Sequence, residues 1–126
     1  MTPDQEYGVV SEAKAAMELR CEAVRRIHFN HKPSRFQSFF GLASIDEAVA
    51  FRNAMRRETG RNGSIWEVEA RCIHHRGDMR LLIPERSSEE TFRAYWEGLP
   101  LDQNQAIWEC LAVPPVTMVA CLVPLE

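Results

Sequence analysis

The chain has 126 residues, of which 45% are hydrophobic and 26% are charged, and this composition excludes disordered and fibrous classes. A domain of this length buries about two-thirds of its unfolded surface, so we expect residues 1–126 to form a single domain. The net charge of −3 gives no overall basic character for nucleic-acid binding, and no apolar run is long enough to span a membrane.

The N-terminus lacks the basic and apolar regions of a signal peptide, so we expect a cytoplasmic protein. The four cysteines lie in apolar stretches and none has Cys-x-x-Cys spacing, which predicts buried, reduced thiols. They are Cys21, Cys72, Cys110 and Cys121. The histidines offer nitrogen ligands, but their spacing is not that of a zinc site, and we expect no metal.

A first helix is predicted from Ser11, which can act as its N-cap. Apolar residues follow at steps of three and four and predict a stripe that faces a core: Ala13, Met17, Cys21, Val24 and Ile27. Pro33 favours a break over residues 30–34.

A short aromatic-rich strand is then predicted over residues 35–40, at the centre of the sheet, and Gly41 ends it. Ser44 and Glu47 have the spacing of a capping box and predict a second helix that ends at Gly60 and packs across the sheet.

Residues 64–72 alternate between apolar and charged side chains, which predicts a half-buried strand. A turn over residues 76–78 and a short helical turn over 79–83 are expected next. Ser87 and Glu90 predict the capping box of a third helix, which ends at Gly98.

Two apolar runs, 106–113 and 116–123, have the length and β-branched content of strands, and they either pair as a hairpin or lie on separate sheet segments. No glycine-rich phosphate loop follows any strand. The order of elements therefore predicts an α+β fold with a mixed or antiparallel sheet and three helices.

Six segments follow one another in an order that is typical of a known fold, namely residues 31–40, 45–51, 65–69, 75–79, 94–98 and 108–111. In this order the chain resembles small bacterial and phage proteins related to the ADP-ribosyltransferase fold. The resemblance implies a split β-sandwich with a cleft that holds NAD, and a family member uses an arginine on the first strand, a serine-containing strand and a late glutamate.

Ser38 matches the position of the serine, and Glu109 matches the late glutamate on a strand side shared with Leu111. Cleavage of the nicotinamide bond generates an oxocarbenium-like sugar, which a fixed carboxylate stabilises. Because a lone acid in an apolar run is costly, Glu109 is either such a site residue or a structurally paired carboxylate.

The arginine of the first strand has no counterpart here, because residues 6–10 form a short segment without arginine. Arg35 is the candidate substitute, and its planar fork suits a phosphate or a carboxylate equally well. Tyr95 and Trp96 are candidates for a nicotinamide platform, although their helical spacing is also typical of core residues.

Two functions follow. The first is an NAD-dependent mono-ADP-ribosyltransferase, such as an effector, toxin or phage protein, that modifies a macromolecular target. The alternative is a non-catalytic module with the same fold that binds or inhibits a partner protein by occupying its surface. The missing first-strand arginine favours the second function, while Ser38 and Glu109 favour the first.

Overall fold

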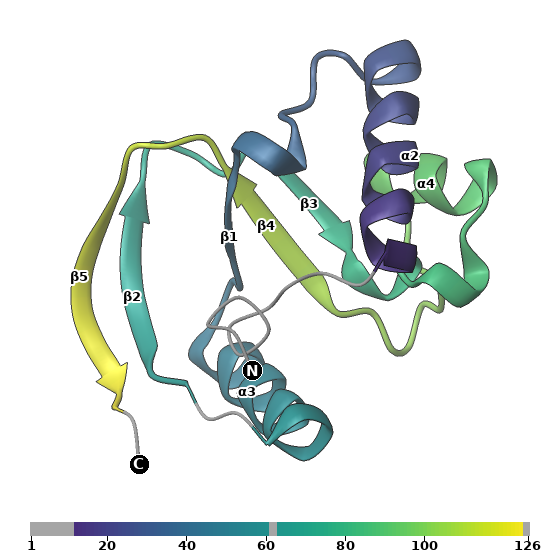
Figure 1. The fold of residues 1–126 in the computed structure, drawn as a ribbon. Coiled ribbons are helices and arrows are strands. Elements are labelled where there is room, and N and C mark those ends of the chain that lie inside the picture. Colours follow the sequence, from purple (N-terminus) through teal and green to yellow (C-terminus); the bar gives the residue numbers. More distant parts are fainter. Residues whose placement is uncertain (1–11, 61–62, 125–126) are drawn as a thin grey trace.

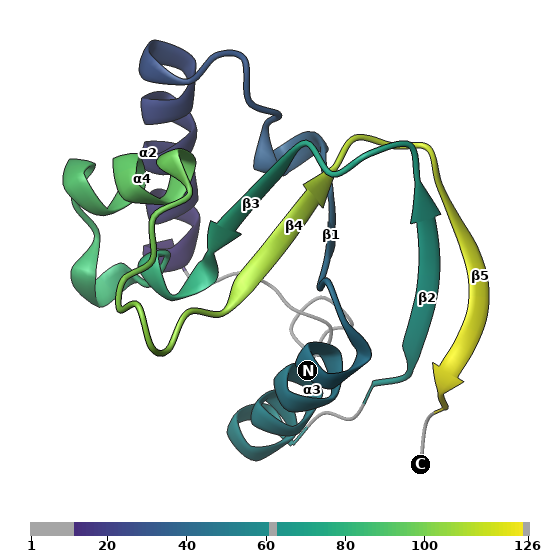
Figure 2. The same ribbon diagram turned by 180° about the vertical axis from the view of Figure 1, so that it is seen from behind.

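Three α-helices and two small antiparallel sheets form the fold in a computed structural model, which describes residues 12–60 and 63–124 (Figures 1 and 2). The elements in chain order are α2 (Glu12–His28), η1 (Arg35–Gln37), β1 (Phe39–Gly41), α3 (Ile45–Thr59), β2 (Ile65–Ala70), β3 (His75–Asp78), η2 (Met79–Leu81), η3 (Pro84–Arg86), α4 (Glu89–Glu97), β4 (Trp108–Ala112) and β5 (Val116–Val123). The predicted α+β class with three helices is confirmed, and of the two alternatives for the sheet, mixed or antiparallel, the structure has antiparallel pairing. The candidate cap Ser11 and the segment 6–10 lie outside the described residues.

The first sheet has the strand order β1–β4–β3, and all its pairs are antiparallel. β4 is its central strand, and residues 109–112 are buried. Gly77 of β3 lies opposite Glu109 of β4, and Phe40 of β1 lies opposite Leu111. The helices α2 and α4 pack beside this sheet (Figure 1). We call the sheet together with these two helices the helix-covered region.

The second sheet consists of β2 and β5 alone, and we call it the ribbon. Both views place it on the far side of the first sheet from α2 and α4 (Figures 1 and 2). Two register shifts interrupt its pairing, so β-bulges bend it. Residues 71–74 and 113–115 connect the ribbon to the first sheet. The two C-terminal apolar runs thus lie in separate sheets, which was one of the two predicted alternatives.

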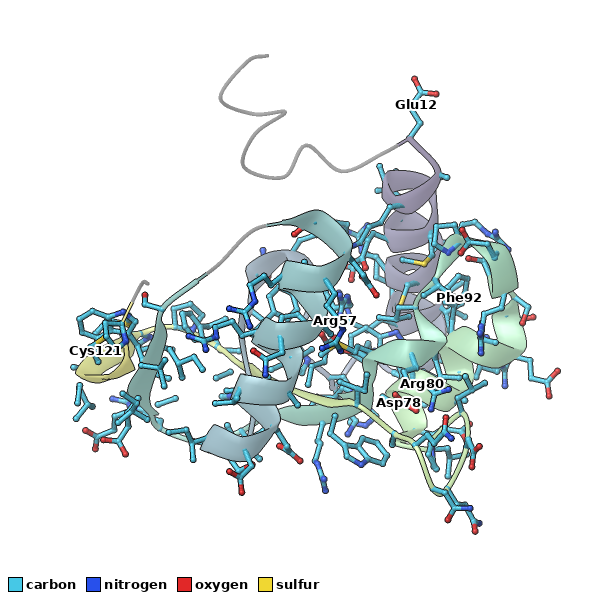
Figure 3. All side chains as sticks on the ribbon, turned by 90° about the horizontal axis from the view of Figure 1, so that it is seen from below. Glu12, Arg57, Asp78, Arg80, Phe92 and Cys121 are labelled. Atoms are coloured by element: carbon cyan, nitrogen blue, oxygen red, sulfur yellow. The ribbon has the colours of Figure 1, made fainter. Side chains whose placement is uncertain are left out.

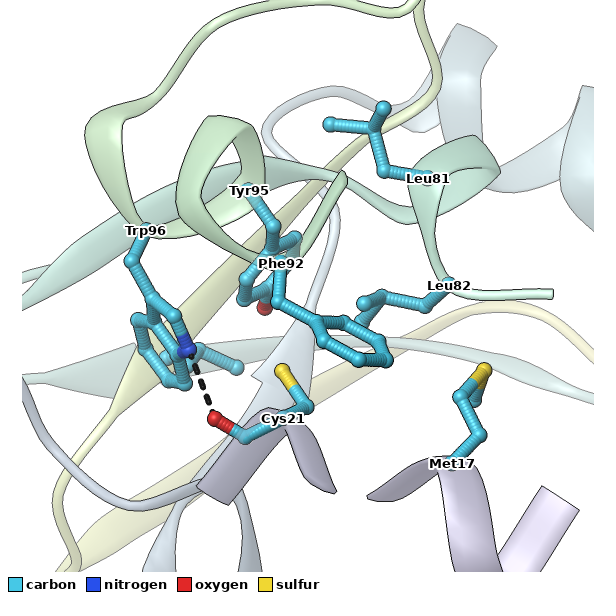
Figure 4. Close-up of a cluster of buried hydrophobic side chains, with 8 residues drawn as sticks. Met17, Cys21, Leu81, Leu82, Phe92, Tyr95 and Trp96 are labelled. Atoms are coloured by element: carbon cyan, nitrogen blue, oxygen red, sulfur yellow. Dashed lines mark hydrogen bonds between the residues drawn. The ribbon is translucent and has the colours of Figure 1, made fainter. Parts of the chain in front are cut away.

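The hydrophobic core lies between α2, α4 and the first sheet (Figure 4). Its buried members are Met17, Cys21, Leu81, Leu82, Phe92, Tyr95, Trp96 and Leu111. The indole N–H of Trp96 donates a 3.2 Å hydrogen bond to the carbonyl of Cys21, which ties α4 to α2. The prediction that an apolar stripe of α2 faces the core is partly correct. Met17 and Cys21 are buried, but Ile27 is exposed at the end of the helix.

The caps of α3 and α4 explain where these helices begin and end. Ser44 Oγ accepts a hydrogen bond from the Glu47 N–H, and Gly60 ends α3 with a left-handed φ of 73°. At α4 the capping box forms between Ser88 and Thr91, one residue later than predicted. Within its described residues α3 buries no side chain completely and touches β2, so the expectation that it packs across the sheet was wrong.

The strand predicted over residues 35–40 is the clearest error. Residues 35–37 form the 3₁₀ helix η1, and the short strand β1 lies at an edge of the sheet rather than at its centre. The cause is local, because Ser34 Oγ accepts from the Phe36 N–H and Ser38 Oγ donates to the Ser34 carbonyl. Such side-chain bonds to the backbone compete with the ladder of a sheet.

The turn predicted over residues 76–78 is instead part of β3. This strand ends at Asp78, which is fully buried and accepts hydrogen bonds from the backbone N–H groups of Arg80 (3.0 Å), Leu101 (2.9 Å) and Ile107 (3.0 Å). Asp78 thereby fixes the loop that leads into β4. Figure 3 shows Asp78 and Arg80 well away from Cys121, which lies on the ribbon.

All four cysteines are free thiols. Cys21 and Cys110 are buried as expected, but Cys72 and Cys121 are exposed because the segments that carry them belong to the ribbon and its connection.

None of the described helices is both long and apolar enough to cross a lipid bilayer.

Candidate functional site

Glu109 lies on β4, the best-buried strand of the helix-covered region, and its residue is 7% exposed. By strand alternation its side chain shares a face with Leu111, which is part of the core beneath α4. A carboxylate in this position is costly to bury without partners. It finds them on two other elements.

Tyr95 of α4 supplies the first partner. Its hydroxyl donates a 2.5 Å hydrogen bond to Glu109 Oε1, and its ring is fully buried. The ring lies over Gly77, where an added Cβ would be only 2.7 Å from Tyr95 Cδ2. Gly77 is thus the residue whose small size lets the phenol reach the carboxylate, as glycine in a strand often does for a close approach.

Arg35 of η1 supplies the second partner. Its Nη1 donates to Tyr95 Oη (2.8 Å) and to Glu109 Oε1, and its Nε donates to Glu18 Oε2 on α2 (2.9 Å). The guanidinium also lies 4.9 Å from the ring centroid of Phe40, within the range of a cation–π contact. Glu18, Arg35, Tyr95 and Glu109 together join four elements, and we call them the Glu109 cluster.

The charges of the Glu109 cluster support one another. Burial alone would lower the pKa of the Arg35 guanidinium, but Tyr95 and Glu18 outweigh it and the pKa is raised. Burial raises the pKa of the Tyr95 phenol, which therefore stays protonated at neutral pH and donates to Glu109. The cluster thus holds a permanent cation beside a carboxylate.

A second ionic group positions Arg35 in the chain. Arg25 binds both carboxylate oxygens of Glu22 at 2.8 Å and the Lys32 carbonyl at 2.9 Å, which fixes the loop after α2. The hydrogen bond from Arg25 is the main reason why the pKa of Glu22 is lowered. This loop ends at Ser34, which is the N-cap of η1. The loop therefore determines the position of Arg35, the first residue of η1.

His75 of β3 packs against Tyr95 and Trp96 of α4. Its ring lies 5.1 Å from the Tyr95 ring and 5.0 Å from the Trp96 ring, and its Nε2 is 2.9 Å from the Tyr95 carbonyl oxygen. Burial lowers the pKa of His75 to about 4, so the imidazole is neutral at pH 7.

Three of the five residues proposed from the sequence are thus in mutual contact, namely Arg35, Tyr95 and Glu109. Ser38 is not among them, because its hydroxyl donates to the Ser34 carbonyl at 2.7 Å. Trp96 is fully buried and leaves no face open to a ligand in this structure.

Sequence reasoning missed Glu18 and Gly77. Glu18 adjoins Met17 of the core stripe, so its closeness to the buried face of α2 was a usable signal. The glycine was assigned to a turn, although an isolated glycine also indicates a close approach within a strand.

Two atoms of the Glu109 cluster have no hydrogen-bond partner among the described residues, namely Glu109 Oε2 and Arg35 Nη2. Their side chains are largely buried, with 9% of Glu109 and 13% of Arg35 exposed. One is an acceptor suited to a hydroxyl and the other a donor suited to a phosphate oxygen.

Metal-ligating groups and surface hollows are two further features that could form a site. In residues 12–60 and 63–124 no group of three or more histidine, cysteine or carboxylate side chains could hold a metal ion. A surface hollow of about 390 Å³ lies instead along α4, lined by residues that include Glu89, Arg93 and Leu99.

The fold and the site define an α+β domain with two antiparallel sheets and an ionic cluster at the centre of one of them. The chain belongs to the family described as "Protein of unknown function (DUF2441)", whose model matches residues 6–122. A comparison with curated proteins finds no match. The match spans α2 through most of β5, so the Glu109 cluster lies inside the family's extent.

Proposed function

We propose that the chain is an NAD-dependent mono-ADP-ribosyltransferase-like protein that modifies a macromolecular target. The observation that carries this proposal is the contact between Glu109 and Arg35, in which Glu109 Oε2 and Arg35 Nη2 have no hydrogen-bond partner among the described residues. They place a carboxylate and a guanidinium side by side on rigid elements, as recognition of a ribose next to a diphosphate requires.

In this proposal each residue has a distinct task. NAD, when bound, supplies the ADP-ribosyl group and nicotinamide as the leaving group. Glu109 holds a fixed negative charge where positive charge develops on the ribose. Arg35 binds phosphate oxygens through Nη2, and Tyr95 holds Glu109 in place through Oε1.

The two separate sheets also support the proposal. Glu109 stands on the central strand of one sheet, and the chain passes directly from β4 to β5 of the other. A split pair of antiparallel sheets is the arrangement implied by the resemblance to ADP-ribosyltransferases. Ser38 and Trp96 receive no role in cofactor binding, since their side chains are engaged elsewhere.

The test compares Glu109→Gln with wild type in a nicotinamide-release assay. The substitution keeps the volume and removes the charge, so we expect a loss of about a hundredfold or more, or about 3 kcal/mol of barrier. Glu69→Gln on the exposed part of β2 is the matched control and should retain wild-type release. Equal release by wild type and Glu109→Gln would refute a catalytic role for this carboxylate.

A second function is favoured by a different observation. Arg35 already has two carboxylate partners, Glu18 and Glu109, as a purely structural arginine would. The ribbon meanwhile exposes large apolar side chains, among them Trp66 (46% exposed) and Met118 (55% exposed). A non-catalytic module of this fold would bind a partner protein through such a surface.

Calorimetry with NAD separates the two functions. The enzyme must bind NAD, and Arg35→Gln should weaken that binding because a phosphate ligand is lost. A folded chain that neither binds nor cleaves NAD is the binding module.

A further inference from the structure

The outer edge of β5 is the largest unsatisfied feature of the ribbon. β5 has eight residues against six in β2, and Val119 and Leu122 have no residue opposite them in the β2 register. Within the described residues no backbone hydrogen bond to β5 is present beyond its pairing with β2. Half of its backbone donors and acceptors therefore face outward, as at any sheet edge.

The side chains of the ribbon are as incompletely covered as its backbone. Trp66 lies opposite Cys121 and Val68 opposite Met118, so one face of the ribbon is apolar. No residue of β5 is buried, and Val119 is 53% exposed. An isolated two-stranded sheet is only marginally stable in water, and added strands stabilise it.

Charge distinguishes the two edges of the ribbon. β2 carries the exposed residues Glu67 and Glu69, so two β2 edges would bring like charges together. β5 reads Val-Thr-Met-Val-Ala-Cys-Leu-Val and carries no charge, proline or glycine. An antiparallel partner for this edge must be extended, and an uncharged apolar strand places no like charges opposite one another. β5 of another molecule meets both conditions.

We propose that β5 pairs with β5 of a second copy of the chain about a two-fold axis. The result is a continuous four-stranded antiparallel sheet in the order β2–β5–β5–β2. A two-fold contact uses the same patch on both molecules, so one edge strand suffices to form it and closes the assembly at two copies. The pairing supplies partners for the outward backbone groups of both strands and removes the exposed apolar edge.

The experiment measures the molar mass of the full-length chain by sedimentation velocity over a wide concentration range. We expect twice the 14.5 kDa of one chain. Val119→Lys and Met118→Lys place a charge at exposed positions of β5 and should return the mass to that of one chain. Leu19→Lys on α2, where the residue is 64% exposed, is the matched control and should remain a dimer.

Hydrogen exchange of the β5 amides gives a second readout. We expect the amides of residues 116–123 to exchange more slowly in wild type than in Val119→Lys, with circular dichroism unchanged. A wild-type chain that has the mass of a single copy at every concentration overturns the proposal, whatever else covers the edge. So does a dimer that both β5 variants leave intact, because it must use another surface.

Discussion

β4 and β5 both come from apolar runs of the sequence but have opposite surroundings. Four of the five residues of β4 are buried, whereas β5 has none. β4 lies between two other strands beneath α2 and α4, and β5 has a neighbour on one side alone among the described residues. The apolar pattern of a strand therefore indicates which of its side chains can be buried. Whether they are buried within one chain depends on the other elements that pack against the strand.

The same contrast applies to polar groups. The helix-covered region buries Asp78 and Glu109 and satisfies each through several hydrogen bonds. The ribbon keeps its carboxylates, Glu67 and Glu69, exposed. Buried acids with fixed partners stand where a site can be held rigidly, whereas the exposed carboxylates of the ribbon lie at its surface.

The largest expected difference between the regions is in their tryptophans. Trp96→Ala should lower the free energy of unfolding by about 3–5 kcal/mol, because a fully buried ring leaves a cavity. Trp66→Ala on the exposed ribbon face should cost less than about 1 kcal/mol. Urea denaturation measures both values. Equal losses would mean that the ribbon face is covered in solution.

Glycines give a smaller contrast. Gly77→Ala forces a Cβ against the buried Tyr95 ring and should cost about 1–3 kcal/mol of stability through overpacking. Gly41→Ala on β1 is the matched control, because no atom lies within 4 Å of an added Cβ there. Thermal unfolding compares the two variants. If Gly77→Ala proves neutral, the ring does not lie over the strand as described.

Acid pH should weaken the helix-covered region gradually. The pKa of His75 is about 4 in the folded chain against 6.5 for the free side chain, so the unfolded state binds more protons between these values. Stability should therefore fall as the pH drops from 6.5 to 4, by at most about 1.4 kcal/mol per pH unit. Denaturation at a series of pH values measures this slope.

A variant of His75 tests the origin of this slope. His75→Gln should flatten the dependence on pH because it removes the titrating group. A slope that persists in His75→Gln would assign the acid sensitivity to other groups, such as Glu22, whose lowered pKa acts at more acidic pH.

Local signals predicted much of this fold. The second helix was expected between Ser44 and Gly60, and the capping hydrogen bonds of both residues are present. The run 116–123 coincides with β5. These features depend on residues close in sequence, which propensity and capping describe well.

Contacts between distant residues were harder to predict. Arg35, Tyr95 and Glu109 were chosen separately, and no sequence spacing indicated that α4 would bring the phenol over Gly77 to the carboxylate. The strand expected over residues 35–40 failed because two serine side chains bind the backbone locally. The burial of the ribbon could not be predicted from the alternation of apolar and charged residues in β2, because this alternation does not indicate which element packs on the apolar face.

The pairing of Ile65 with Val123 also has a consequence for the order of folding. The chain between β2 and β5 contains β3, α4 and β4. The two ends of this long segment must come together before β2 and β5 can pair. A long flexible loop loses entropy on closure, and prior folding of these elements shortens the part that is still free. The ribbon should consequently assemble last on the folding pathway, and in a single copy of the chain it should be the first part to open while the remainder stays folded.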